Sequence, residues 1–284
     1  MKTSSLVRPQ NILRIYLVLL YIGALISARD LEFAVQSFLL FLAVNLGYFL
    51  PFLVQKARGI PSRMRLENAS ITVFILILLL EQRVGLVWAL LLGLVTALIK
   101  MKFRFQGKPI LNPAAAGLAV LTIFGMSATW WGVSFAPRFS ELFISLAAFV
   151  TLPVAGYVAY KYHKLPIAAA LFGSFALASF VFSGSIPWII LVEGTLLFFA
   201  LVMAVEPLTT PVIRNEQLVY GTSIGVLLAL FLSQSWLLPY CGPLLLLNAG
   251  YALYRWWKQK QMMAGIAAKK ASSSPVPTLK SEKS

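Results

Sequence analysis

The sequence is poor in the residues that build most redox and metal sites. It has one cysteine, Cys241, and one histidine, His163, among 284 residues. A single cysteine excludes a disulfide framework, a Cys-x-x-Cys redox pair and an iron–sulfur cluster held by this chain alone. A single histidine excludes a haem held by two histidines of the chain. Electron transfer through a metal would therefore depend on other proteins.

Charged residues are also scarce, and acids are the rarest of them. Only 12% of the residues are charged, whereas 60% are apolar. This composition is typical of an integral membrane protein and excludes an ordinary soluble domain. The 24 lysines and arginines outnumber the 9 acids, which leaves a net charge of +15.

Windows that are apolar and long enough to cross a bilayer as helices occur at about ten places. They are roughly 12–28, 33–54, 69–81, 85–100, 109–126, 141–159, 165–182, 187–205, 217–233 and 236–254. The first run is not followed by a small-residue cleavage site, so we expect it to be retained as a helix. The sequence thus predicts an all-α polytopic membrane domain over residues 1–257.

The basic residues predict the orientation of these helices. With the N-terminus in the cytoplasm, 21 lysines and arginines fall inside and only 3 outside, namely Arg29, Arg83 and Arg138. This bias predicts that both termini are cytoplasmic. Topology and attraction to anionic lipid explain the positive charge, so nucleic acid is not an expected partner. We expect the basic, Ser/Pro-rich stretch 258–284 to be a disordered cytoplasmic tail.

The chain also contains an internal similarity. Leu86–Leu98 reads LVWALLLGLVTAL and Leu218–Leu230 reads LVYGTSIGVLLAL, which aligns Gly93 with Gly225. An apolar run that ends in glutamate precedes each segment. Ten helices then divide into two five-helix repeats, about 12–126 and 141–254. An odd number of helices per repeat gives the two repeats opposite orientations in the membrane.

The two glutamates that end these apolar runs are Glu81 and Glu206. The predicted topology places Glu81 at the outer face and Glu206 at the inner face. Pro207 favours the end of the helix at Glu206, and Thr209 and Thr210 follow in a polar loop. Carboxylate, hydroxyl and free carbonyl oxygens suit a hard cation such as sodium, so these four polar residues are candidate ion ligands. The alternative is that Glu206 is an ordinary solvated loop acid.

Asparagines in or beside the apolar helices are candidate ligand contacts. Asn112 can cap the helix that Pro113 begins, and Lys108 belongs to a basic run just before it, which would suit an anion such as phosphate. Asn45 and Asn248 lie inside apolar windows and must find polar partners there. Simple capping, helix packing and hydrogen bonds between helices are the alternatives.

Four segments together resemble one protein family. They are KMKFRFQGKPILNPAA (Lys100–Ala115), MAVEPLTTP (Met203–Pro211), YGTSIGVLLAL (Tyr220–Leu230) and LLLLN (Leu244–Asn248). The family is the RnfD/NqrB family, whose members belong to the Rnf-type electron-transport complex and to the related sodium-translocating NADH:quinone reductase. The chain departs from the family pattern at Leu111, where the family has phenylalanine, and at Glu206, where it typically has aspartate.

The resemblance implies a membrane subunit of a flavin-dependent complex, in a prokaryotic plasma membrane, that couples electron transfer to sodium or proton movement. Family members carry FMN covalently on the threonine of an S-G-A-T-like motif. Here the corresponding segment reads MSAT and ends at Thr129 without the glycine. We therefore expect no covalent FMN. A noncovalent flavin, FMN or riboflavin, remains a candidate cofactor, with Asn112, Pro113, Lys108, Thr209 and Asn248 as its candidate ligands.

Three hypotheses for function stay open at this point. The first is the membrane subunit of a redox complex, with other subunits and a quinone as partners. The second is a solute or ion transporter, because inverted five-helix repeats also build channels of the urea- and ammonium-transporter type. The third is a scaffold subunit of a redox complex that has no cofactor of its own.

Overall fold

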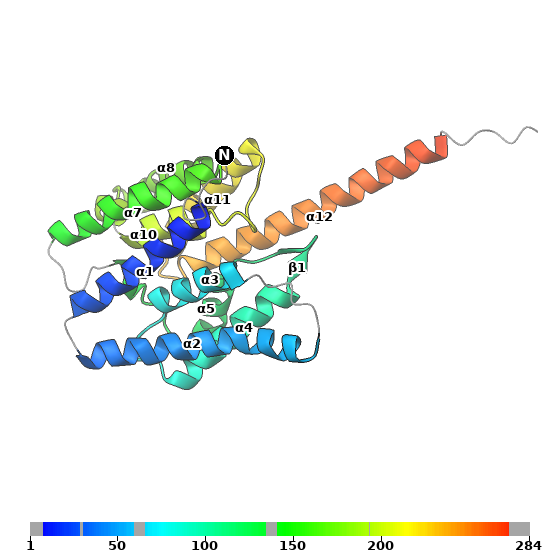
Figure 1. The fold of residues 1–284 in the computed structure, drawn as a ribbon. Helices are drawn as coiled ribbons and strands as arrows, with labels where there is room; N and C mark the ends of the chain where they lie inside the picture. Colours follow the sequence, from blue (N-terminus) through cyan, green and yellow to red (C-terminus); the bar gives the residue numbers. More distant parts are fainter. Residues whose placement is uncertain (1–7, 29–30, 60–65, 135–140, 193, 273–284) are drawn as a thin grey trace, which may run out of the picture.

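The computed structural model describes residues 8–28, 31–59, 66–134, 141–192 and 194–272, and most of them are helical (Figure 1). Among the described residues, four helices are long and apolar enough to cross a membrane. They are α1 (Pro9–Ala28), α2 (Leu31–Ala57), α8 (Leu165–Ser183) and α11 (Arg214–Ser233). The chain is therefore a helical protein with the spans of a membrane protein, as its composition predicts.

The remaining elements are shorter or less apolar. They are α3 (Leu66–Leu79), α4 (Leu86–Lys102), a hairpin of β1 (Arg104–Phe105) and β2 (Lys108–Pro109), α5 (Pro113–Ile123), α6 (Trp131–Ser134), α7 (Glu141–Lys161), α9 (Trp188–Val192), α10 (Gly194–Phe198), the π-helix η2 (Phe199–Met203) and α12 (Cys241–Ser272).

Each predicted window contains a helix, but ten full-length spans are not confirmed. The window 69–81 forms α3, which has 14 residues, and 109–126 forms α5, which has only 11. The window 187–205 is divided among α9, α10 and η2. The segment Thr195–Val205, which contains η2 and most of α10, is buried throughout, and α3 and α5 are largely buried, whereas Trp188 and Ile189 of α9 are exposed. A helix enclosed by other helices can end within the protein without exposing its free backbone groups to lipid.

Glycines allow two pairs of long helices to pack with their backbones in contact. A Cβ added to Gly93 of α4 would lie 2.3 Å from the carbonyl oxygen of Val44 in α2. A Cβ added to Gly225 of α11 would lie 2.5 Å from the carbonyl oxygen of Leu171 in α8. Small residues permit such close approach between helices in membranes. The two glycines that the internal similarity aligns therefore have the same role in two separate helix pairs.

The basic ends of several elements lie on one side of the bundle. Figure 1 shows the C-terminal ends of α2 and α4 and the β1–β2 hairpin on the same side, where α12 also leaves the bundle. Lys56, Lys100 and Lys102 lie in the last turns of α2 and α4. This arrangement agrees with a single basic face, while the orientation of that face in the membrane stays a prediction.

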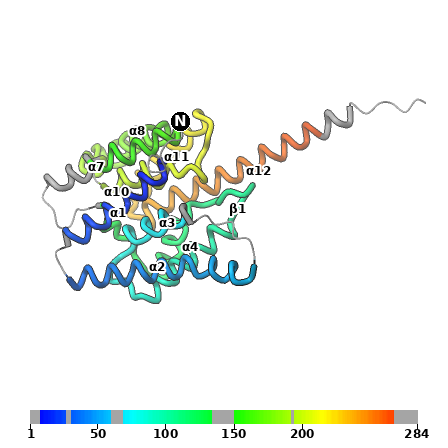
Figure 2. The backbone as a smooth tube through the Cα atoms, viewed as in Figure 1, coloured from blue at the N-terminus to red at the C-terminus, as the bar shows by residue number. Residues whose placement is uncertain are grey.

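The prediction of disorder beyond Trp257 is wrong for residues 258–272. Helix α12 extends from Cys241 to Ser272. Its coloured part in Figure 2 projects from the bundle. The segment 258–272 contains glutamine, methionine, alanine and lysine, which are good helix formers, and no proline interrupts it. A helix already nucleated in the membrane domain extends through such residues at little cost. Residues 273–284 lie outside the described part of the chain.

The glycine contacts generate the first prediction. Gly93→Leu and Gly225→Leu should each lower the melting temperature of the protein in detergent by several degrees, because overpacking costs about 1–3 kcal/mol. Gly173→Leu in α8 is the control, since a Cβ there has no neighbour within 4 Å. Melting followed by fluorescence measures the effect. Equal melting temperatures for all three variants would contradict the close helix crossings.

Candidate functional site

A cavity of about 110 Å³ brings together residues from several parts of the chain. It is lined by the start of α1, by α3, by the end of α4, by the start of α5 and by the segment that follows η2. Its lining residues are Gln10, Leu13, Ile71, Thr72, Ile75, Lys100, Asn112, Pro113, Ala114, Tyr162, Val202, Glu206, Pro207 and Leu208. The candidate cofactor residue Asn112 and the candidate ion ligand Glu206 therefore face one cavity.

The loop 204–213 connects η2 to α11 and carries Glu206. The π-helix ends where the backbone N–H of Ala204 donates to the backbone oxygen of Phe199 at 2.8 Å. The hydroxyl of Thr210 donates to the backbone oxygen of Glu206 at 2.7 Å, and the hydroxyl of Thr209 donates to its Oε2 at 3.3 Å. Both predicted threonines thus contact Glu206. π-Helical turns often occur at functional sites, so η2 supports this segment as a candidate functional site.

Two buried side chains hold the far end of this loop. Lys164, at the start of α8, donates from Nζ to the backbone oxygens of Thr210, at 3.4 Å, and Pro211. Gln217 of α11 donates to the backbone oxygens of Pro211 at 3.2 Å and His163 at 3.0 Å. Burial and the nearby Lys108 lower the pKa of Lys164 to about 8. The loop is therefore a fixed structure in which several carbonyl groups already have donors.

Asn112 fastens the other side of the site. Its Oδ1 accepts from the backbone N–H of Ala115 at 3.1 Å, which caps α5, and its Nδ2 donates to the backbone oxygen of Met203 at 3.3 Å. Asn112 is 3% exposed, and Pro113 occupies the first turn of the helix. The asparagine thus joins the start of α5 to the end of η2, and the predicted capping role is confirmed.

The electrostatic environment of Glu206 favours a titrating acid. Burial raises the pKa of Glu206 from 4.5 to about 7, although Lys100 and the Thr209 hydroxyl partly oppose the shift. Lys100 is 8% exposed and donates to Thr72 at 3.1 Å. The ammonium group of Lys100 would repel a sodium ion placed beside Glu206. Among the described residues, no group of three or more His, Cys, Asp or Glu is placed to hold a metal.

Three of the predicted site residues, Glu81, Lys108 and Asn248, neither line this cavity nor contact Glu206. Glu81 follows α3 and lies in a separate turn, where Ser127 donates to its carboxylate. Lys108 is exposed in β2. Asn248 is buried in α12 and accepts a hydrogen bond from Tyr220. These three residues were chosen as candidates from the sequence, but they are not part of the Glu206 site.

A flavin does not fit the residues around Asn112. Drug-sized ligands need pockets of roughly 300–1,000 Å³, whereas this cavity is about 110 Å³. Both ends of the Asn112 amide are also used within the protein. A flavin at this position would have to break the cap of α5 and its bond to η2.

The residues that complete the site carry no recognisable signal in the sequence. Lys100, Lys164 and Gln217 are polar residues near the ends of apolar helices, and positive-inside bias alone explains the two lysines. Only the fold shows that they are buried and that they surround Glu206 and its loop. The spacing of Thr72 and Lys100, 28 residues apart, gave no local signal for their contact.

Comparison with known proteins does not assign the chain. No protein-family model matches the sequence, and no curated protein is detectably similar to it.

The raised pKa of Glu206 generates a prediction about stability. The folded protein holds the Glu206 proton more tightly than the unfolded chain does, so ionisation costs folding free energy. This loss of stability is absent below pH 4.5, the ordinary pKa of a glutamate. It grows as the pH rises and is complete above pH about 7.

Melting temperatures in detergent between pH 4 and 8 measure this effect. Wild type should lose several degrees more than Glu206→Gln across the window, since each pKa unit corresponds to about 1.4 kcal/mol. Parallel curves for the two proteins would show that Glu206 titrates as an ordinary surface acid.

Proposed function

We propose that this chain is the membrane subunit of a redox-driven, ion-translocating complex and that it handles the transported proton at Glu206. The redox part of the proposal rests on the family resemblance of the four sequence segments. The proton part rests on the site itself. Partner subunits deliver the electrons, because the cavity at Asn112 does not fit a flavin.

The observation that carries the proposal is the position of Glu206 in a cavity, at a break in a buried helix and near Lys100. An acid with a pKa near 7 gains and loses a proton at physiological pH with little driving force. Ionisable groups at helix breaks in membrane proteins mark ion and proton pathways. Lys100 makes a proton a better occupant than sodium, because a neutral protonated carboxyl adds no second cation.

The second acid, Glu81, extends the proposal to a path across the membrane. We infer two inverted five-helix repeats, supported by the matching glycine crossings of α2 with α4 and of α8 with α11. Glu81 and Glu206 each follow a short helix and each accept from a hydroxyl, that of Ser127 or Thr209. In this arrangement Glu206 takes up the proton from the cytoplasmic side and Glu81 lies near its exit.

An autonomous transporter is the second candidate function. The engaged amide of Asn112 and the small cavity favour it, because they give no place for the expected flavin. A cofactor-free scaffold is the third candidate, and it requires no role for Glu206. The visible spectrum of the complex purified through this chain separates the first candidate from an autonomous transporter, since a redox complex absorbs through its flavin or iron–sulfur subunits.

The Glu206→Gln variant tests the proton role and separates the first candidate from a scaffold. It keeps the size of the side chain, so the complex should assemble at the wild-type level. Proton uptake driven by an electron donor in inverted vesicles should fall by about tenfold or more, the equivalent of 1.4 kcal/mol. Glu32→Gln is the matched control, because Glu32 is an exposed acid at the start of α2. Equal activity of the two variants would refute the assignment of Glu206.

The sequence also predicts that Thr129 carries no covalent flavin, because its segment lacks the glycine of the family motif. Thr129 is exposed in the loop between α5 and α6. The denatured protein should show no flavin fluorescence after gel electrophoresis under ultraviolet light. A fluorescent band that disappears in Thr129→Ala would contradict this prediction.

A further inference from the structure

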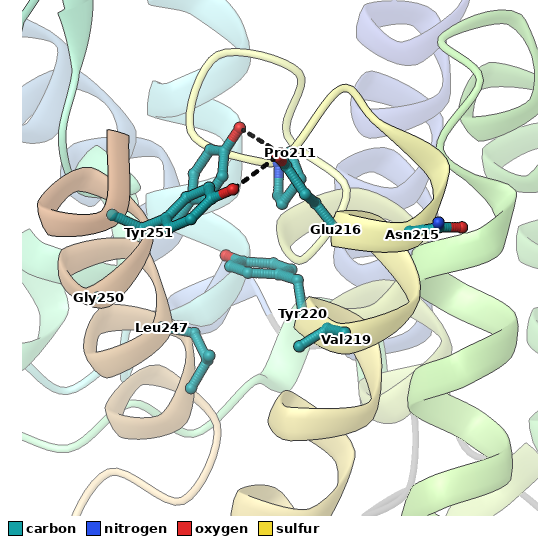
Figure 3. Close-up of a pocket in the computed structure, with 9 residues that line it drawn as sticks. Pro211, Asn215, Glu216, Val219, Tyr220, Leu247, Gly250 and Tyr251 are labelled. Carbon is teal, nitrogen blue, oxygen red and sulfur yellow. Dashed lines mark hydrogen bonds between the residues drawn. The ribbon is translucent and has the colours of Figure 1, made fainter. Parts of the chain in front are cut away.

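A second and larger cavity lies between α11 and α12, and the proton site does not use it. It has a volume of about 410 Å³, within the range of small-molecule sites. Its lining residues are Pro211, Asn215, Glu216, Val219, Tyr220, Leu247, Gly250, Tyr251 and Tyr254 (Figure 3). Apolar and aromatic side chains make up most of this lining, and Glu216 is its one acid.

The aromatic rings of this cavity surround a carboxylate. Tyr251 and Tyr254 donate to the two oxygens of Glu216 at 3.4 and 3.3 Å, as the dashed lines in Figure 3 show. The ring centroid of Tyr251 lies 6.3 Å from that of Tyr220 and 6.2 Å from that of Tyr254. Aromatic faces grouped around an acid attract an alkylammonium group.

Cations lie at the edge of the same cavity. Lys258 pairs with Glu216 at 3.3 Å and is half exposed. Arg255 lies over the ring of Tyr251 at 5.9 Å. A ligand that carries an ammonium group and, a few atoms away, an anion would match this arrangement, because its ammonium group meets Glu216 while its anion meets Lys258 and Arg255.

Exposed apolar and aromatic side chains of α11 and α12 lie on and beside the lining of this cavity. Val219 of α11, which lines the cavity, is 68% exposed, and Leu253, which precedes Tyr254 in α12, is 67% exposed. Trp256 and Trp257 are exposed on the next turn of α12, and tryptophans of this kind mark the membrane–water boundary. These exposed side chains suit a ligand that has an apolar part and a polar end.

We propose that this cavity binds the head group of a zwitterionic aminophospholipid, such as phosphatidylethanolamine. The ammonium group lies among the three tyrosines beside Glu216. The phosphate contacts Lys258, which leaves Glu216 when the ammonium group arrives. The acyl chains run along the exposed apolar residues of α11 and α12. This site is independent of the proton-handling role of Glu206, and its test does not involve that residue.

Gly250 allows the cavity to be filled without disturbing the helices. A Cβ added to Gly250 has no neighbour within 4 Å, and the residue lines the cavity. Gly250→Leu should therefore occupy the head-group space. Gly173→Leu is the control, because Gly173 is equally open but lies on α8, away from this cavity.

Native mass spectrometry of the full chain, offered equal amounts of phosphatidylethanolamine and phosphatidylglycerol, tests the proposal. Wild type and Gly173→Leu should retain phosphatidylethanolamine about tenfold more than phosphatidylglycerol, a difference of 1.4 kcal/mol. Gly250→Leu should lose this retention. Glu216→Gln should keep a bound lipid but lose the preference, because the cavity remains and the carboxylate is gone.

Three results would overturn the proposal. One is equal retention of both lipids by wild type. Another is retention by Gly250→Leu at the wild-type level, which would place the lipid elsewhere. The third is a quinone or flavin that copurifies with wild type and is lost in Gly250→Leu, which would make the cavity a redox ligand site.

Discussion

The structure depends on one constraint: backbone that leaves the helical conformation inside a membrane protein must find its hydrogen bonds within the protein. The loop 204–213 meets this constraint with side chains from distant helices. Lys164 and Gln217 bind its carbonyl groups, and Asn112 binds the end of η2 that precedes it. These polar anchors allow Glu206 to stay at a break in a buried helix.

The same constraint explains why the site combines so many charged and polar groups. Further polar groups lie close to Glu206 itself. Lys100 approaches the carboxylate from α4, and Thr209 and Thr210 contact Glu206 from its own loop. Burial and these neighbours act on the carboxyl in opposite directions, and burial has the larger effect on its pKa. The result is an acid whose protonation changes near neutral pH.

The positions of the helices could be predicted from the sequence because they depend on local pattern, whereas the close glycine contacts were found in the structure. Apolar windows predict helices, and the alignment of Gly93 with Gly225 matches two equivalent helix crossings. Helix lengths were harder to predict from the sequence. The helices α5 and η2 are short because other helices enclose them. Polar composition alone predicts disorder beyond Trp257, whereas helix-forming residues extend α12 to Ser272.

The candidate site was predicted in part. Glu206, its two threonines and Asn112 carry local signals, namely proline neighbours, hydroxyls and a capping position. Lys100 and Lys164 carry no such signal, because a lysine at a helix end is ordinary in a membrane protein. Their contacts span 28 and 46 residues of sequence, and only the packing of the helices brings the partners together.

Infrared difference spectroscopy of the purified protein tests the central claim most directly, because a protonated carboxyl has its own C=O stretch. Wild type should show such a band below neutral pH and lose it as the pH passes about 7. Glu206→Gln should lack this band. A wild-type spectrum whose carboxyl bands all disappear near the ordinary value of 4.5 would contradict the claim that Glu206 holds a proton at physiological pH.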